Sequence, residues 1–429
     1  MCRPSCFDWW SRLLALADAG GDGPGLSRRG FLAAAALPIV ATGCASAVTP
    51  PAGPTRDLLD ATLSFDLHSH PGLFRSTSND TLAGHRQSAE AGHVKLISLT
   101  ATSDAPVLGR DARGGLRAAR EPQPGELYAS MYRQLEILVA WSVAAGMPTV
   151  LGVDAAAAPG PPVRGLLAVE GCDFLEGRVD RVQEAFDRGI RSLQLVHYRV
   201  NELGDIQTEA PVHGGLTPFG RDAVRQMNRL GIVVDVAHAT HDVVRGVTET
   251  TTQPIILSHS DIQDASGWAR FISPDHARRV AETGGVIGSM PIILGRRGGD
   301  DVSAYVQYIS RLVDVVGVDH VGIGTDMDGI GPGAIFTSYA RWPSLAAALV
   351  EHGYRPEEVG KILGGNAQRV FQRVETRKDS GSSRGVPPGV GMKRPSMRHA
   401  GAAGPGGFRG DHRLEDPRAA VMVSGDVSR

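Results

Sequence analysis

Cysteine, aromatic residues and an excess of charge of either sign are all scarce in this sequence. The 429 residues include four cysteines, and the aromatic content is 5%. The 44 Lys and Arg residues nearly balance the 46 Asp and Glu residues, so the formal net charge is −2. This balance creates no electrostatic field that would favour nucleic acid or an acidic membrane surface. We therefore expect no nucleic-acid partner.

The few cysteines also exclude a disulfide framework. Cys2, Cys6 and Cys44 lie in a segment that resembles a removable leader. Cys172 would then be a lone thiol in the mature chain.

Long hydrophobic runs are missing too, and the run from Phe31 to Val40 is too short to span a bilayer. It follows Ser-Arg-Arg-Gly-Phe-Leu, which resembles a twin-arginine export signal at Arg28 and Arg29. A signal peptidase could cut at the small residues 45–47. Alternatively, 41–44 is an imperfect lipobox with Cys44 lipidated. We expect an exported protein, either periplasmic or anchored to the membrane as a lipoprotein.

Composition divides the chain into three parts. Residues 1–47 form the expected export signal with an N-terminal extension, and residues 378–429 are rich in Gly, Pro, Ser and Arg and are expected to be disordered. Residues 48–377 remain for one catalytic domain. With 42% apolar residues the chain can bury one large core, and a barrel of eight βα units takes about 250 residues.

Eight short apolar runs alternate with helical patterns in this middle part. Strands are expected at 63–66, 94–100, 165–169, 190–196, 232–236, 255–257, 285–289 and 321–325. Helices are expected at 127–145, 179–188, 219–230, 274–282, 302–316 and 356–363. A further apolar run at 149–153 is expected in an insertion between the second and third strands. Eight alternating units predict an α/β fold of the (β/α)8 TIM-barrel type.

Five potential metal ligands stand where expected strands end. They are His68, His70, Glu170, His238 and His259. In a TIM barrel the active-site groups come from the C-terminal ends of the strands, so ligands far apart in sequence can converge on one point. The pattern indicates a metal-dependent hydrolase.

Four sequence blocks resemble the membrane dipeptidase family, also called renal dipeptidases, of the amidohydrolase superfamily. They are GGLTPFGRDAVRQMNRLGIVVDVAHAT at 214–240, QPIILSHSDIQ at 253–263, VDHVGIGTDMDGI at 318–330 and VGKILGGNAQRVF at 359–371. The last block looks like the closing helix of that family. The resemblance extends from about Ser64 to Phe371.

This resemblance implies two Zn²⁺ ions bridged by Glu170. His68 and His70 match the first ion, and His238 and His259 match the second. The chain departs from the family at His70, where members usually have aspartate, which makes the site about one charge unit more positive. A mixed His and carboxylate site does not by itself distinguish Zn²⁺ from Mn²⁺, Fe²⁺ or Co²⁺.

The resemblance also implies a mechanism. A hydroxide bridging the metals would attack the peptide carbonyl of a dipeptide, including one with a D-residue at its C-terminal side. Asp326 matches the catalytic residue that carries the proton to the leaving amine, and Asp328 could compete for this role. His197 matches the histidine that binds the substrate carbonyl, and Arg270 lies where the family grips the substrate carboxylate. A homodimer is implied as well.

Two other functions stay open at this point. The same barrel and metals could hydrolyse a lactone, ester, β-lactam or phosphoester, as the wider superfamily does, and the His-x-His pattern at His68 and His70 favours this alternative. An exported metal-binding protein without catalysis is the alternative outside enzymes. The presence of Glu170, Asp326 and all the histidines argues against it.

Overall fold

The computed structural model describes residues 54–71, 73, 79–112, 114–160, 162–292, 301–330 and 334–376. The expected export signal at 1–47 and the expected disordered tail at 378–429 lie outside the described residues.

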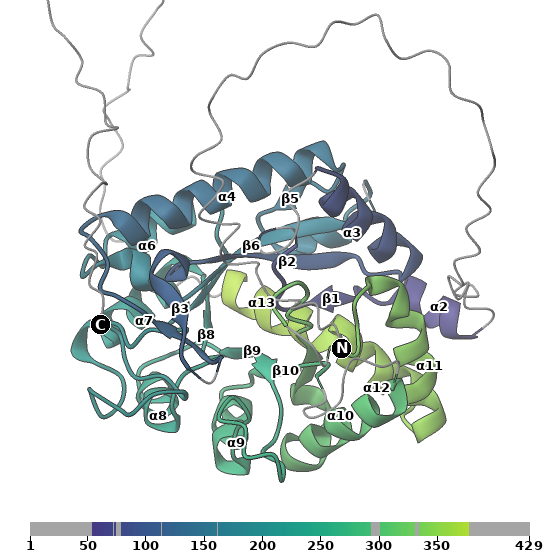
Figure 1. The fold of residues 1–429 in the computed structure, drawn as a ribbon. Coiled ribbons are helices and arrows are strands. Elements are labelled where there is room, and N and C mark those ends of the chain that lie inside the picture. Colours follow the sequence, from purple (N-terminus) through teal and green to yellow (C-terminus); the bar gives the residue numbers. More distant parts are fainter. Residues whose placement is uncertain are drawn as a thin grey trace, which may run out of the picture. The chain divides into compact units, whose positions relative to one another are not determined.

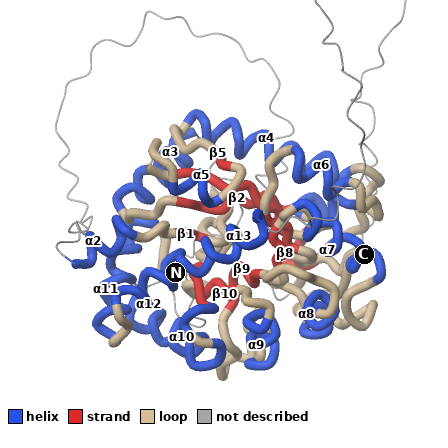
Figure 2. The backbone as a smooth tube through the Cα atoms, turned by 180° about the vertical axis from the view of Figure 1, so that it is seen from behind, coloured by secondary structure: helices blue, strands red, loops and turns tan. Residues whose placement is uncertain are grey.

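Eight parallel strands close into a barrel, with helices packed around it (Figures 1 and 2). They are β1 (Phe65–Asp66), β2 (Leu96–Thr102), β6 (Arg164–Glu170), β7 (Ser192–Gln194), β8 (Val233–Asp235), β9 (Ile256–Ser260), β10 (Val286–Ser289) and β11 (Val321–Ile323). Neighbours pair in this order, and β11 pairs back to β1. All eight lie where the sequence places a strand, so the predicted (β/α)8 barrel is confirmed.

The insertion between β2 and β6 is also present. It contains the antiparallel pair β3 (Leu108–Arg110) and β4 (Leu116–Ala118), and the short strand β5 (Thr149–Val150), which pairs with β6. The apolar run at 149–153 therefore lies in the insertion, as predicted, and its first two residues form a strand.

The six expected helices are found. The described residues also form five further helices, apart from the last helix, which is treated below. The expected ones are α4 (Glu126–Ala144), α6 (Arg181–Asp187), α7 (Pro218–Leu230), α9 (Pro274–Glu282), α10 (Val302–Val316) and α12 (Pro356–Gly360), which continues into a π-helix at Lys361–Gly365. The others are α2 (Pro54–Ala61), α3 (Asn79–Ala91), α5 (Val153–Ala157), α8 (His241–Thr248) and α11 (Trp342–His352). Short 3-10 turns lie at Ala105–Val107, Asp173–Leu175, Val318–His320 and Tyr339–Arg341.

Capping residues explain where several helices begin and end. The Thr217 side chain accepts a hydrogen bond from the backbone N–H of Gly220, Pro218 fills the first turn, and α7 ends at Gly231 with a φ of 78°. Ser273 caps α9 in the same way. These local signals fix the length of helices that pack on the barrel.

The last helix, α13 (Asn366–Thr376), closes the N-terminal end of the barrel. Its apolar residues join the inward-facing residues at the start of the strands in one buried cluster, where the rings of Phe65 and Phe371 lie 5.2 Å apart. This confirms the expected closing helix. With one end filled by apolar side chains, polar groups gather at the other end, where the strands terminate.

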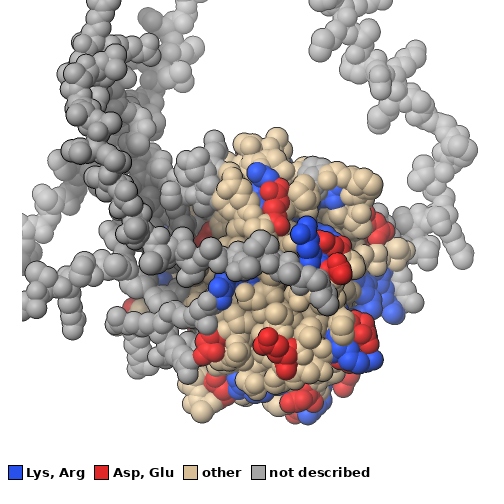
Figure 3. Space-filling view, turned by 90° about the vertical axis from the view of Figure 1, so that its right-hand side faces the viewer, with Lys and Arg blue, Asp and Glu red and all other residues tan. Residues whose placement is uncertain are grey.

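On the face shown in Figure 3, Lys and Arg side chains lie beside Asp and Glu side chains rather than forming a field of one sign. Among the described helices, none combines the length and apolar character needed to cross a bilayer.

Candidate metal centre

Each expected ligand lies at or just beyond the C-terminal end of a barrel strand. His68 and His70 follow β1, Glu170 is the last residue of β6, His238 follows β8, and His259 is within β9. All five side chains are buried. The barrel therefore brings together residues that are up to 191 positions apart in the sequence.

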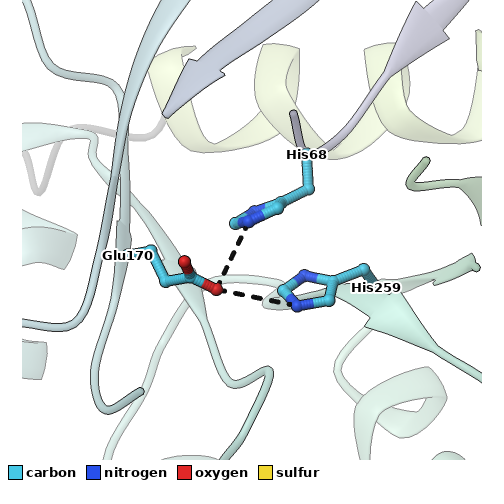
Figure 4. Close-up of side chains that lie close together, drawn as sticks. All are labelled: His68, Glu170 and His259. Atoms are coloured by element: carbon cyan, nitrogen blue, oxygen red, sulfur yellow. Dashed lines mark ion pairs between the residues drawn. The ribbon is translucent and has the colours of Figure 1, made fainter. Parts of the chain in front are cut away.

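The carboxylate of Glu170 is the centre of this cluster. Its Oε1 lies 3.4 Å from His68 Nε2, 3.3 Å from His238 Nε2 and 3.7 Å from His259 Nε2. Its Oε2 lies 3.3 Å from His70 Nε2. In Figure 4, His68 and His259 come from opposite sides and point at the same oxygen. One carboxylate thus reaches both pairs of histidines, as a bridging ligand must.

The spacing of the imidazoles fits divalent cations. His68 Nε2 and His70 Nε2 are 3.1 Å apart, and so are His238 Nε2 and His259 Nε2. Two nitrogens bound to one tetrahedral Zn²⁺ lie about 3.3 Å apart, given Zn–N distances of about 2.0–2.1 Å. Among the described residues, three sets of three ligand atoms are close enough to hold an ion: His68–Glu170–His259, His68–His70–Asp326 and Glu170–His197–His238.

A hydrogen bond fixes the orientation of the His70 ring and places a hydrogen on Nδ1. His70 Nδ1 lies 3.0 Å from the backbone oxygen of Thr100. A carbonyl can only accept, so Nδ1 carries the hydrogen and Nε2 keeps its lone pair for a cation. His238 Nδ1, by contrast, is buried without a hydrogen-bond partner among the described residues.

The charges in the site favour a bound cation. Burial raises the pKa of Glu170, but the imidazoles of His197 and His68 outweigh burial and hold that pKa well below its usual range. Burial lowers the pKa of His70, but Asp326 and Glu170 raise it to about 10, so Nε2 of His70 must release a proton when it binds a cation. Burial and neighbouring positive groups hold the pKa values of His238 and His259 well below the usual value, which keeps both neutral and able to bind metal.

His197 follows β7 and lies beside the same carboxylate. Its Nε2 is 3.2 Å from Glu170 Oε2, and its Nδ1 is 2.7 Å from Asp104 Oδ1. Burial lowers the pKa of His197, but Asp104 and Glu170 outweigh burial and raise it. The expected carbonyl-binding histidine is thus part of the cluster, with a carboxylate behind it.

Asp326 reaches the cluster from the end of β11, whereas Asp328 does not. Asp326 Oδ1 is 3.4 Å from His70 Nε2, and its backbone N–H donates to the oxygen of His68. Asp328 Oδ2 instead lies 2.7 Å from Nε2 of His85 on α3. Of the two candidate aspartates, the geometry favours Asp326 as the one beside the ligands.

The backbone is strained at two of these residues. His238 has a φ of 66° and Asp326 a φ of 47°, values that are uncommon for residues with a side chain. Backbone strain of this kind clusters at functional sites, where the surrounding structure holds it in place.

Arg270 is almost fully buried near the same centre. Its Nη1 donates to Gln207 Oε1 at 2.6 Å and its Nη2 to the backbone oxygen of His259 at 3.4 Å. Burial lowers the pKa of Arg270, although the carboxylates of Glu170 and Asp326 oppose this. The guanidinium group therefore lies within the electrostatic influence of Glu170 and Asp326.

Several other histidines have partners outside the cluster. His320 Nδ1 lies 2.8 Å from the backbone oxygen of Gly285, at the N-terminal end of the barrel. His213, His93 and His352 each bond a residue outside the cluster. Cys172 is a free, buried cysteine, in agreement with the prediction.

Three supporting residues were not predicted. They are Asp104 behind His197, Gln207 beside Arg270, and Ser258 between two of the ligands. Each contacts a residue distant in sequence, and none belongs to a spacing pattern. Of the three, only Ser258 could have been noticed in the sequence, because it directly precedes the expected ligand His259.

A family comparison agrees with this geometry. The model of the membrane dipeptidases, peptidase family M19, matches residues 152–384, more than half of the chain. The chain belongs to the membrane dipeptidase family. The matched stretch includes Glu170, His197, His238, His259 and Asp326, whereas His68 and His70 precede it.

Curated relatives of this membrane dipeptidase family member match over part of its length. Dipeptidase tcpJ of Claviceps purpurea is 33% identical over 219 residues, covering 49% of this chain and 51% of the relative. Dipeptidase aclJ of Aspergillus oryzae is 30% identical over 223 residues, covering 50% and 52%. The chain thus spans about half the length of the curated relatives it matches.

Solved structures show the same fold. A Rhodobacter sphaeroides metallopeptidase, liganded with a phosphinate mimic of the dipeptide L-Ala-D-Ala, has a TM-score of 0.61 at 19% identity, covering 73% of this chain and 99% of that one. The probable dipeptidase PvdM of Pseudomonas aeruginosa has a TM-score of 0.61 at 18% identity, covering 75% and 98%.

Proposed function

We propose that this protein is a metal-dependent dipeptidase that holds two Zn²⁺ ions. The observation that carries the proposal is the convergence of four imidazole Nε2 atoms on the single carboxylate of Glu170 at the C-terminal end of the barrel. Membership of the membrane dipeptidase family supports the choice of a peptide bond as the target. Chelator-sensitive release of amino acids from a dipeptide tests the proposal.

The family resemblance and the close approach of the Nε2 atoms within each histidine pair support the following ligand sets. His68 and His70 would hold one ion, His238 and His259 the other, and Glu170 both. Such ions supply a water of lowered pKa and polarise a carbonyl oxygen. Two neutral histidines on each side and one shared carboxylate leave the centre positive, which favours the negative charge that develops on a peptide carbonyl under attack.

The residues around the ligands would carry the remaining steps. Asp326, beside His70, would take the proton of the attacking water and give it to the leaving amine. His197 would donate a hydrogen bond from Nε2 to the carbonyl oxygen, because Asp104 accepts from Nδ1 and favours the protonated ring. Arg270 would bind the free carboxylate of the substrate with its planar fork of N–H groups.

These roles define the substrate class. A free carboxylate near the scissile bond selects short peptides, above all dipeptides, and includes those with a D-residue at the C-terminal side. The dipeptide mimic bound by the Rhodobacter sphaeroides relative is consistent with this class.

One observation favours a second candidate function. His70 occupies the position at which family members usually have an aspartate ligand. Its Nε2 lies 3.1 Å from Nε2 of His68. A more positive centre would also suit hydrolysis of a lactone, ester, β-lactam or phosphoester, and these compounds belong in any substrate panel.

We also propose export through the segment 1–47, with Cys44 as an alternative lipid anchor, on the basis of the sequence alone. Green fluorescent protein fused after residue 47 is expected to reach the periplasm, since the twin-arginine route carries folded proteins. Replacing Arg28 and Arg29 by lysine preserves the charge and is expected to keep the fusion in the cytoplasm. Equal export of both fusions would contradict the proposed route.

We also propose a homodimer, which the family resemblance suggests. Light scattering of the purified protein tests it.

A further inference from the structure

The side chain of Ser258 lies between one histidine of each proposed metal position. Ser258 belongs to β9 and is fully buried. Its Oγ is 2.9 Å from Nδ1 of His259 and 3.4 Å from Nδ1 of His68. The two ring centroids lie 4.0 Å apart and the ring planes are tilted by 33°, so one hydroxyl reaches the Nδ1 side of both. Figure 4 shows the opposite edges of these rings, where both point at Glu170.

Asp235, the last residue of β8, holds the backbone of Ser258 in place. Its carboxylate accepts hydrogen bonds from the backbone N–H groups of Ser258 and Ala237, each at 3.0 Å. A serine oxygen has two lone pairs and can accept from two donors at once. The Ser258 hydroxyl can therefore accept from Nδ1–H of His259 and of His68 together.

We propose that Ser258 is a positioning residue that holds the rings of His68 and His259 with Nδ1 toward its hydroxyl and Nε2 toward Glu170. The inference rests on the proposed function, because this orientation matters only if these histidines bind metal. When the Ser258 oxygen accepts from Nδ1–H of both rings, each Nε2 keeps its lone pair for a cation. His70 has a separate partner for the same purpose, the backbone oxygen of Thr100. Ser258 alone, among these partners, serves one histidine on each side of Glu170.

The hydroxyl can be removed without freeing the backbone. A Cβ at Gly288 would lie 1.9 Å from the backbone oxygen of Ser258, and one at Gly324 would lie 1.8 Å from it. These neighbouring strands approach the Ser258 backbone so closely that its place in the barrel is fixed independently of the side chain. The hydrogen bond from the Ser258 N–H to Asp235 is also kept in an alanine variant.

The test compares Ser258→Ala with Ser98→Ala in the full chain. Ser98 is a fully buried serine on β2 whose Oγ has no hydrogen-bond partner among the described residues, so its variant controls for loss of a buried hydroxyl. Zinc affinity is measured by competition with a chromophoric chelator, and the melting temperature of the metal-free proteins is measured by circular dichroism. Nitrogen-15 NMR of labelled histidine reports the tautomers.

We expect Ser258→Ala to weaken binding of both ions by about 10- to 100-fold, the usual effect of losing a group that orients a metal ligand. Ser98→Ala is expected to bind zinc like the wild type, and the metal-free melting temperatures of the two variants should agree. Wild-type zinc affinity in Ser258→Ala, or equal weakening in both variants, would overturn the inference while leaving the proposed function intact. A wild-type chain that binds no zinc would overturn both.

Discussion

Replacing Asp326 with asparagine is expected to lower kcat/KM for a dipeptide by about 100- to 10,000-fold, the range that general acid–base catalysis contributes. The side chain of Asp326 is 18% exposed and that of Glu170 is 3% exposed, so Asp326 is the more accessible carboxylate of the centre. Asparagine has the same shape and tolerates the positive φ found here, but it cannot take up a proton from water. We therefore expect both zinc ions to stay bound while turnover is lost.

The matched control for this variant is Asp328→Asn. Asp328 is two residues further along, also has a positive φ, and contacts His85 rather than the ligands. We expect kcat/KM of the Asp328→Asn variant to fall by less than about tenfold, because a group that only orients a loop contributes less to catalysis than the residue that carries the proton. Zinc content is measured on both variants. Full activity of Asp326→Asn would refute its role, and loss of one ion would reassign Asp326 as a ligand, which its closeness to His68 and His70 permits.

Replacing Arg270 with alanine is expected to weaken the binding of substrates that have a free carboxylate by about 2–5 kcal/mol. This is the usual loss when one partner of a buried charge pair is removed. This corresponds to a decrease in kcat/KM of roughly 30- to 4,000-fold. Arg270 is 2% exposed, so water cannot replace it as a partner for the substrate. The same variant should change kcat/KM little for the dipeptide amide, which has no carboxylate to bind.

The substrate pair provides the control for Arg270. If kcat/KM of the variant falls by the same factor for the dipeptide and for its amide, Arg270 supports the site through its hydrogen bond to the backbone of His259 and does not bind the substrate carboxylate. Arg270→Gln, which keeps a polar side chain that can donate to that backbone oxygen, separates these cases further. Melting temperatures of both variants show whether the barrel has survived the removal of a buried side chain.

The strands and the positions of the proposed ligands could be predicted from the sequence because both depend on local pattern. A buried strand in a parallel barrel is a short apolar run, and a ligand such as His259 stands at the end of one. Helix α8 was missed because its sequence contains three valines, one threonine and a glycine, which favour a helix weakly, although Thr240 caps its N-terminus. α3 and α11 were likewise missed.

The supporting groups could not be predicted, because they arise only when the barrel closes. Asp104 lies 93 residues before His197, and Ser258 lies 190 residues after His68. Nothing in one local window links such pairs. The positive φ of His238 and Asp326 is equally hidden, since neither residue type requires it and the surrounding hydrogen bonds impose it.

The most direct test of the account is hydrolysis of a defined substrate panel by the full chain loaded with zinc. The panel contains L,L and L,D dipeptides, their amides, N-acyl amino acids, and lactone, ester, β-lactam and phosphoester compounds. The account predicts amino-acid release from the dipeptides, its loss with a chelator, and its return when zinc is added. Turnover of another class with no cleavage of any dipeptide would contradict the central claim and would assign the His70 centre to a different reaction.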